Sequence, residues 1–233
     1  MTSDLRARAL EIHRCLRTAY GEPERPSDPD PVRALVLTIL SQNTNDRLRD
    51  VAFDRLRAAF PAWEQVRDAP EQAIAEAIQI AGLGQQKARH IKGALQRITE
   101  ERGRLNLDFL REMPGDGARQ WLLSMKGVGR KTAAIVLLFT LDKPAFPVDT
   151  HIHRVSKRLG LIPGSASRDK AHDLLEALLL PETYYGFHIN LIQHGREVCQ
   201  ARRPRCEACS LCHVCDYYTA NSEPQMNTDK RGF

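Results

Sequence analysis

The sequence of 233 residues has no apolar run that approaches the ~20 residues needed to span a membrane. Its first residues, MTSDLRARALEIHR, are charged and lack the apolar centre of a secretory signal peptide. It also lacks any internal repeat or low-complexity tract. We therefore expect a cytoplasmic protein without a membrane partner.

Alternating runs of β-branched residues, the usual signal of strands, are nearly absent. Most segments instead repeat apolar residues at helical spacing, which predicts an all-α fold of roughly ten helices joined by short turns. The clearest predicted helices cover residues 5–16, 32–40, 70–81, 87–102, 118–124, 130–141, 167–180 and 184–196.

Basic residues outnumber acidic ones by 34 to 29, which gives a formal net charge of +5. This excess suits a polyanionic partner such as nucleic acid, although many basic proteins bind none. Charge alone therefore gives only a modest indication of nucleic-acid binding.

Five of the six cysteines lie between positions 199 and 215. In a reducing compartment such crowding indicates a metal site rather than disulfides. Two ligand sets are possible, because Cys212 lies between Cys209 and Cys215 and could replace Cys199. Four thiolates can hold zinc or an iron–sulfur cluster, and the spacing alone does not choose between them.

The loop between the first two cysteines of this cluster is basic. Arg202, Arg203 and Arg205 all lie between Cys199 and Cys206. A metal centre that pins this loop would create a surface suited to phosphate groups.

Residues 125–137, MKGVGRKTAAIVL, place a glycine-rich turn directly before an apolar helix. A nucleotide P-loop would need glycine at two positions that are held by Met125 and Arg130. A dinucleotide-binding fingerprint would need a preceding strand and a third glycine, and both are missing. What remains is helix, tight turn and helix, in which Gly127 and Gly129 can adopt positive φ.

The N-terminus of the helix at 130 is a candidate phosphate site, because its first N–H groups have no partner within the helix. A loop that merely turns the chain is the usual reading of two nearby glycines. Lys131 shifts the balance, since the helix dipole and the nearby Lys126 and Arg130 favour its neutral amine. A neutral amine can attack carbon, whereas a charged lysine would only contact phosphate.

Asp149 follows a proline-containing link and precedes a helical run. Its simplest role is to cap that helix. At the mouth of a cleft that also holds Lys131, its carboxylate could instead stabilise a positively charged sugar or move protons.

The hairpin followed by Lys131, the VDTH at 148–151 and the spacing C-x6-C-x2-C-x5-C together resemble the helix-hairpin-helix DNA glycosylases of the endonuclease III type. The resemblance extends from Asp30 to Cys215. It implies that Lys131 is a Schiff-base nucleophile and Asp149 the catalytic carboxylate. It further implies a [4Fe-4S] cluster, with Cys212 as an extra thiol and with these ligands: Cys199, Cys206, Cys209 and Cys215.

The resemblance also implies several DNA contacts. Gln42 or Asn43 would fill the gap left by an extruded base, and Leu83 would wedge into the opposite strand. The arginines of the cysteine loop and the hairpin would hold the DNA backbone, the hairpin through Lys126, Gly127, Val128, Gly129 and Arg130.

Two helical domains with a DNA cleft between them are expected from the same resemblance. A six-helix barrel domain would cover 24–143 and carry the hairpin. Residues 1–23 and 144–218 would form the iron–sulfur domain. The polar composition of 219–233 predicts a disordered tail.

The implied function is a monomeric, nucleoid-associated DNA glycosylase and AP lyase of base excision repair. It would remove oxidised pyrimidines such as thymine glycol from duplex DNA and cut the strand by β-elimination. Two alternatives stay open: a monofunctional glycosylase for adenine or alkylated bases, and a non-catalytic DNA-binding iron–sulfur protein. Lys131 disfavours an adenine glycosylase, and a mere binding module would need neither Lys131 nor Asp149.

The sequence departs from the family pattern just before the hairpin. Met125-Lys126-Gly127 replaces the usual Leu-Pro-Gly, which loosens the turn and adds a charge. The segment 108–120 is longer than in the bacterial prototype and would reshape one wall of the cleft.

Overall fold

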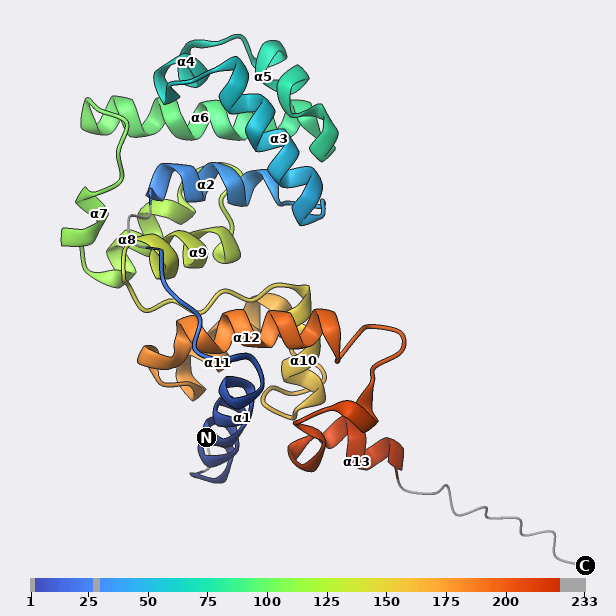
Figure 1. Ribbon diagram of the computed structural model, residues 1–233. Helices are drawn as coiled ribbons and strands as arrows, with labels where there is room; N and C mark the ends of the chain where they lie inside the picture. Colours follow the sequence, from blue (N-terminus) through green and yellow to red (C-terminus); the bar gives the residue numbers. More distant parts are fainter. Residues whose placement is uncertain (1–2, 27–29, 223–233) are drawn as a thin grey trace, which may run out of the picture. The chain divides into compact units, whose positions relative to one another are not determined.

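The computed structural model describes residues 3–26 and 30–222 (Figure 1). All regular structure in these ranges is helical and no strand occurs in them, which confirms the predicted all-α class. No helix within the described part of the chain is long and apolar enough to cross a membrane.

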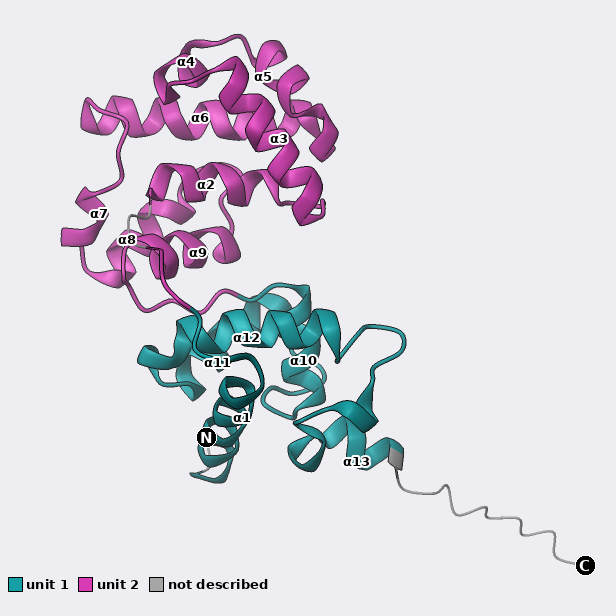
Figure 2. Cartoon of the chain, in the orientation of Figure 1, with its two compact units in different colours: residues 1–23, 148–233 teal, residues 24–147 magenta. Residues whose placement is uncertain are grey.

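The chain divides into two compact units, residues 24–147 and residues 1–23 with 148–233 (Figure 2). The expected boundary at 143/144 comes too early, because Ala145 is fully buried and belongs to the core of the first of these units. We call residues 24–147 the hairpin unit and the other part the cysteine unit.

The hairpin unit has a core of buried side chains, most of them aliphatic and most of them from its helices. Its longest helix, α6, packs along α4 and α5, while α2 packs on α9 (Figure 1). Its helices are α2 (Pro31–Leu40), α3 (Asp46–Ala59), α4 (Trp63–Asp68), α5 (Glu71–Ile78), η1 (Gln79–Ala81), α6 (Gly84–Arg102), α7 (Phe109–Glu112), α8 (Gly115–Leu123) and α9 (Arg130–Thr140).

In the cysteine unit, α12 packs against both α1 and α10. The helices are α1 (Ser3–Tyr20), α10 (Thr150–Arg158), α11 (Arg168–Leu178), η2 (Pro181–Thr183), α12 (Tyr184–Glu197), η3 (Cys206–Ala208), η4 (Cys212–Val214) and α13 (Asp216–Ser222). Ser167 caps α11 as predicted, because its side chain accepts a hydrogen bond from the Lys170 amide.

Short polar side chains explain where several helices begin. Asp30 Oδ1 accepts from the amides of Val32 and Arg33, and Pro31 occupies the first helical position of α2, where no N–H is needed. Asn45 caps α3 in the same way through the amide of Leu48.

The disordered tail predicted from residue 219 begins too early in the sequence. Thr219 belongs to α13, where its amide and its hydroxyl both donate to the carbonyl of Cys215. The Tyr217 ring in the same helix stacks on the guanidinium of Arg158, with 4.6 Å between the ring centre and the guanidinium carbon. The contact between Arg158 and Tyr217 ties α13 to α10. The rest of the expected tail, 223–233, lies outside the described residues.

Candidate functional site

The turn of the hairpin between α8 and α9 depends on Gly127. Its φ is +85°, and a Cβ at this position would lie 2.3 Å from atoms of the His90 ring. Gly129 differs, because its φ of −92° and ψ of 179° are open to any residue and nothing lies within 4 Å of a Cβ there. The expectation of positive φ at both glycines is therefore wrong for Gly129.

Val128 offers little to a DNA ligand. Its side chain is buried in the core of the hairpin unit, and its amide donates to the carbonyl of Met125 at 3.1 Å. Lys126 and Gly129 are exposed, and Gly127 and Arg130 are half-buried. The exposed part of the hairpin is thus the rim around Val128 rather than Val128 itself.

Lys131 is the second residue of α9 and is half-buried. The helix begins after Gly129, so no side-chain oxygen caps it, and its first turn holds no acidic residue. The positive end of the helix dipole and its first N–H groups are therefore left for an external anion. Lys131 and Asp149 are carried by different units of the chain.

Asp149 is the N-cap of α10. Its Oδ1 accepts a hydrogen bond of 2.7 Å from the amide of Ile152. The structure thus confirms that Asp149 caps the helix that follows it. The carboxyl group of this half-buried side chain thus lies at the N-terminus of α10.

The side chain of Gln42 attaches the loop 41–45 to the hairpin. Gln42 Nε2 donates to the carbonyl oxygen of Gly127 at 2.9 Å. Asn43 is exposed at φ +52°, a left-handed conformation that few residues other than glycine adopt. Of the two residues proposed to enter DNA from this loop, Gln42 is therefore engaged within the protein and Asn43 projects from it.

Leu83 is an exposed apolar side chain between two glycines. It retains 52% of its accessible surface and has a left-handed backbone, with φ +53° and ψ +35°. Gly82 before it has φ +70°, and α6 begins directly after it. Exposed and strained residues of this kind concentrate at functional sites.

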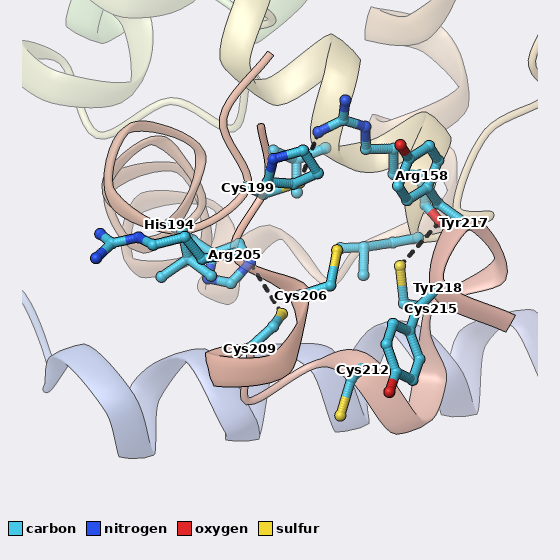
Figure 3. A pocket seen from close by; sticks show the side chains of 14 residues that line it. Arg158, His194, Cys199, Arg205, Cys206, Cys209, Cys212, Cys215, Tyr217 and Tyr218 are labelled. Carbon is cyan, nitrogen blue, oxygen red and sulfur yellow. Dashed lines mark hydrogen bonds between the residues drawn. The ribbon is translucent and has the colours of Figure 1, made fainter. Parts of the chain in front are cut away.

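The cysteines of the cluster line a small cavity in the cysteine unit (Figure 3). Two of the sulfurs have an N–H donor nearby: Arg158 Nη1 lies 3.3 Å from Cys199 Sγ, and the Leu211 amide lies 3.4 Å from Cys209 Sγ. The side chain of Cys212 extends away from Cys206 and Cys215 in Figure 3. The ligand set that uses Cys199 stays our prediction, although Cys212 lines the same cavity.

Burial raises the pKa of the thiols of Cys206 and Cys215, and raises that of Cys209 to about 11. Such thiols carry a proton at neutral pH unless a cationic centre replaces it. In the described residues no three His, Cys, Asp or Glu side chains are close enough to hold a single metal ion. The four thiols and their N–H donors nevertheless fit the chemistry of an iron–sulfur cluster, whose sulfurs accept hydrogen bonds.

The three arginines of the cysteine loop are all exposed, but they differ in their contacts. Arg205 donates through its guanidinium to the carbonyl oxygen of Glu197 at the end of α12. The side chain of Arg205 is thus held by the protein. Arg202 and Arg203 are the better candidates for contact with the DNA backbone.

Two buried polar residues of α6 were not predicted from the sequence. Lys87 is 1% exposed and His90 is 8% exposed, both on α6. A signal was available, because Lys87 stands at helical spacing with the apolar positions Ala88, Ile91 and Ala94. A charged residue on an apolar stripe needs partners inside the protein.

Comparison with known proteins adds to this geometry. Residues 36–181 match the family model described as HhH-GPD superfamily base excision DNA repair protein. A putative DNA glycosylase of Arabidopsis thaliana, At3g47830, is 40% identical over 162 residues, which are 70% of this chain and 55% of that protein. Endonuclease III of Sulfolobus acidocaldarius is 34% identical over 189 residues, covering 80% of this chain and 82% of its own length.

The endonuclease III of Thermotoga maritima is also 34% identical, over 205 residues that cover 88% of this chain and 91% of that protein. Among solved structures, a non-covalent complex of endonuclease III with DNA superposes with a TM-score of 0.80 at 26% identity. The match covers 95% of this chain and 99% of that one.

Proposed function

The chain belongs to the HhH-GPD superfamily of base excision DNA repair proteins, and from that membership we propose that it is a bifunctional DNA glycosylase and AP lyase for oxidised pyrimidines. The observation that carries the proposal is the position of Lys131. It follows the hairpin directly and lies in the first turn of α9, whose N-terminus has no side-chain cap. A phosphate bound at this N-terminus and a reacting sugar could be neighbours there.

Duplex DNA binds through its phosphates, to the hairpin rim and to the exposed Arg202 and Arg203. Asn43 and Leu83 then enter the duplex while a damaged base is extruded. Extrusion costs a few kcal/mol, and least for lesions that already pair poorly. This cost favours damaged pyrimidines over intact pairs without a direct reading of sequence.

The amine nitrogen of Lys131 attacks C1′ of the sugar as the bond from C1′ to the base breaks and the base leaves with the bonding electron pair. The carboxylate of Asp149 stabilises the positive charge that develops on the sugar. Loss of a proton and opening of the sugar ring give a Schiff base between Lys131 and C1′. Removal of a proton from C2′ then expels the 3′ phosphate, which cuts the strand by β-elimination.

A [4Fe-4S] cluster held by Cys199, Cys206, Cys209 and Cys215 would supply a structural cross-link to the loop that carries the arginines. Arg158 would support it by donating to the sulfur of Cys199. The DNA substrate would place the protein on the nucleoid, and the site needs no second copy of the chain.

Trapping with borohydride tests the proposal. The protein is incubated with a duplex that carries one abasic site, and borohydride reduces any Schiff base to a stable covalent complex. We expect a complex with the wild type and with Lys126→Ala, whose lysine is a close neighbour, but none with a folded Lys131→Ala. DNA binding without any trapped complex in the wild type would contradict the lyase and favour a monofunctional glycosylase.

A further inference from the structure

Lys87 is a lysine inside the core of the hairpin unit. Only 1% of its surface is exposed, and its ammonium donates to the carbonyl oxygens of Leu40 and Ala81, each at 2.8 Å. Burial lowers its pKa from the ordinary value, because the charged form loses its hydration. A lysine is almost never buried this completely without partners, so these two bonds account for its presence.

The two carbonyls mark the bases of two different loops. Leu40 is the last residue of α2, directly before the loop 41–45 that presents Asn43. Ala81 ends η1, directly before Gly82 and Leu83. One ammonium group thus joins two loops that are far apart in the sequence, each of which exposes a residue in left-handed conformation.

Helix α6, which carries Lys87, also supports a third loop, the turn of the hairpin. His90, nearly one turn after Lys87 on α6, packs against Gly127 of the hairpin. Gln42 links the loop 41–45 to the same turn, because its amide donates to the carbonyl of Gly127. The start of α6 is therefore a common base for all three loops within one compact unit.

A purely structural explanation is that Lys87 only satisfies carbonyls at helix ends, which lack partners within the helix. Water or a local side chain could do this for each carbonyl separately. A single donor that binds both at once does something more, because it fixes the distance between the two loops.

We propose that Lys87 is a positioning residue that holds the loops of Asn43 and Leu83 in register, so that both side chains enter damaged DNA together. The inference rests on the proposed function, since it assigns these loops to DNA. Without Lys87 the loops would still fold, but the arrangement competent for insertion would be populated only part of the time.

The test uses full-length protein and a duplex in which a stable abasic analogue lies opposite 2-aminopurine. The fluorescence of 2-aminopurine rises when protein side chains unstack it. Lys87→Met removes every donor at nearly constant length. Lys143→Met is the matched control, because Lys143 also donates to two main-chain carbonyls, those of Arg111 and Met113, away from these loops.

We expect wild type and Lys143→Met to reach the same fluorescence plateau at saturating protein. Folded Lys87→Met should reach less than half of that plateau, because most of its bound complexes would hold the two loops out of register and leave 2-aminopurine stacked. Trapping at a preformed abasic site should change less than the plateau, because that reaction needs no base to be extruded. A purely structural role would leave the plateau of the bound complex unchanged.

Circular dichroism shows whether each variant is folded. If Lys87→Met does not fold, Lys87→Gln carries the test, because its amide donates but is one bond too short to hold both carbonyls. A wild-type plateau in the folded variant would overturn the inference. A wild type that does not prefer the abasic duplex over undamaged DNA would overturn the proposed function, and the inference with it.

Discussion

The imidazole of His90 lies so close to Gly127 that the two positions are coupled. A Cβ at 127 would be 2.3 Å from Cγ and from Nδ1 of the ring. Because Gly127 also has φ +85°, it is fixed both by its own backbone and by the residue beneath it. Replacing Gly127 by a residue with a Cβ should therefore destabilise the hairpin.

Gly127→Ala should destabilise the protein by about 1–3 kcal/mol, from the strained φ and the contact with His90. Gly129→Ala is the matched control and should be nearly neutral, since its backbone is extended and no atom lies within 4 Å of the added Cβ. Urea unfolding of both variants measures the difference. Equal stability of the two would contradict this account of the turn.

The fold class and most helices were predictable because apolar residues repeat regularly along them. The short helices α4, α7 and α13 were not identified, since four to seven residues carry too little periodicity. The cap at Ser167 was predictable because capping depends on local sequence alone.

Contacts between distant segments could not be predicted in the same way. Nothing in the sequence places Gln42 against Gly127, and the choice between Gln42 and Asn43 therefore needed coordinates. The partners of Lys87 are main-chain carbonyls, which leave no pattern in the sequence. The sequence predicts which chemical groups form the candidate site, but not the residues that support them.

His90 should make the native state sensitive to acid. Burial lowers the pKa of its ring, and the positive charges of Lys126 and Arg89 act in the same direction. Below the ordinary histidine pKa of about 6.5, the unfolded chain binds a proton at His90 that the native chain does not bind. The free energy of unfolding therefore decreases as the pH falls toward the pKa of the folded state.

Replacing the ring by an amide, His90→Asn, removes this titration. We expect its urea midpoint to fall less between pH 7 and pH 5.5 than that of the wild type, whose other histidines titrate in both proteins. An identical fall in the two proteins would mean that His90 titrates normally in the native state.

The iron content of cysteine variants separates the two possible ligand sets. Cys212→Ser should keep its iron and its visible absorbance, because the side chain points away from the other thiols in Figure 3. Cys199→Ser should lose both, although Arg158 would still be present to bind the loop through the carbonyls of Gln200 and Ala201. The reverse pattern would assign the cluster to Cys206, Cys209, Cys212 and Cys215.

Asp149 has a structural role as a cap and a proposed chemical role, and Asp149→Asn separates them. Asparagine caps helices about as well as aspartate, so the melting temperature should change little, while excision of a damaged base should slow by roughly 10²-fold or more. Asp30→Asn is the matched control, because Asp30 caps α2 through the same kind of bond and has no proposed part in the chemistry. If Asp149→Asn excises bases at the wild-type rate, the cap is its whole function, and another group must stabilise the charged sugar.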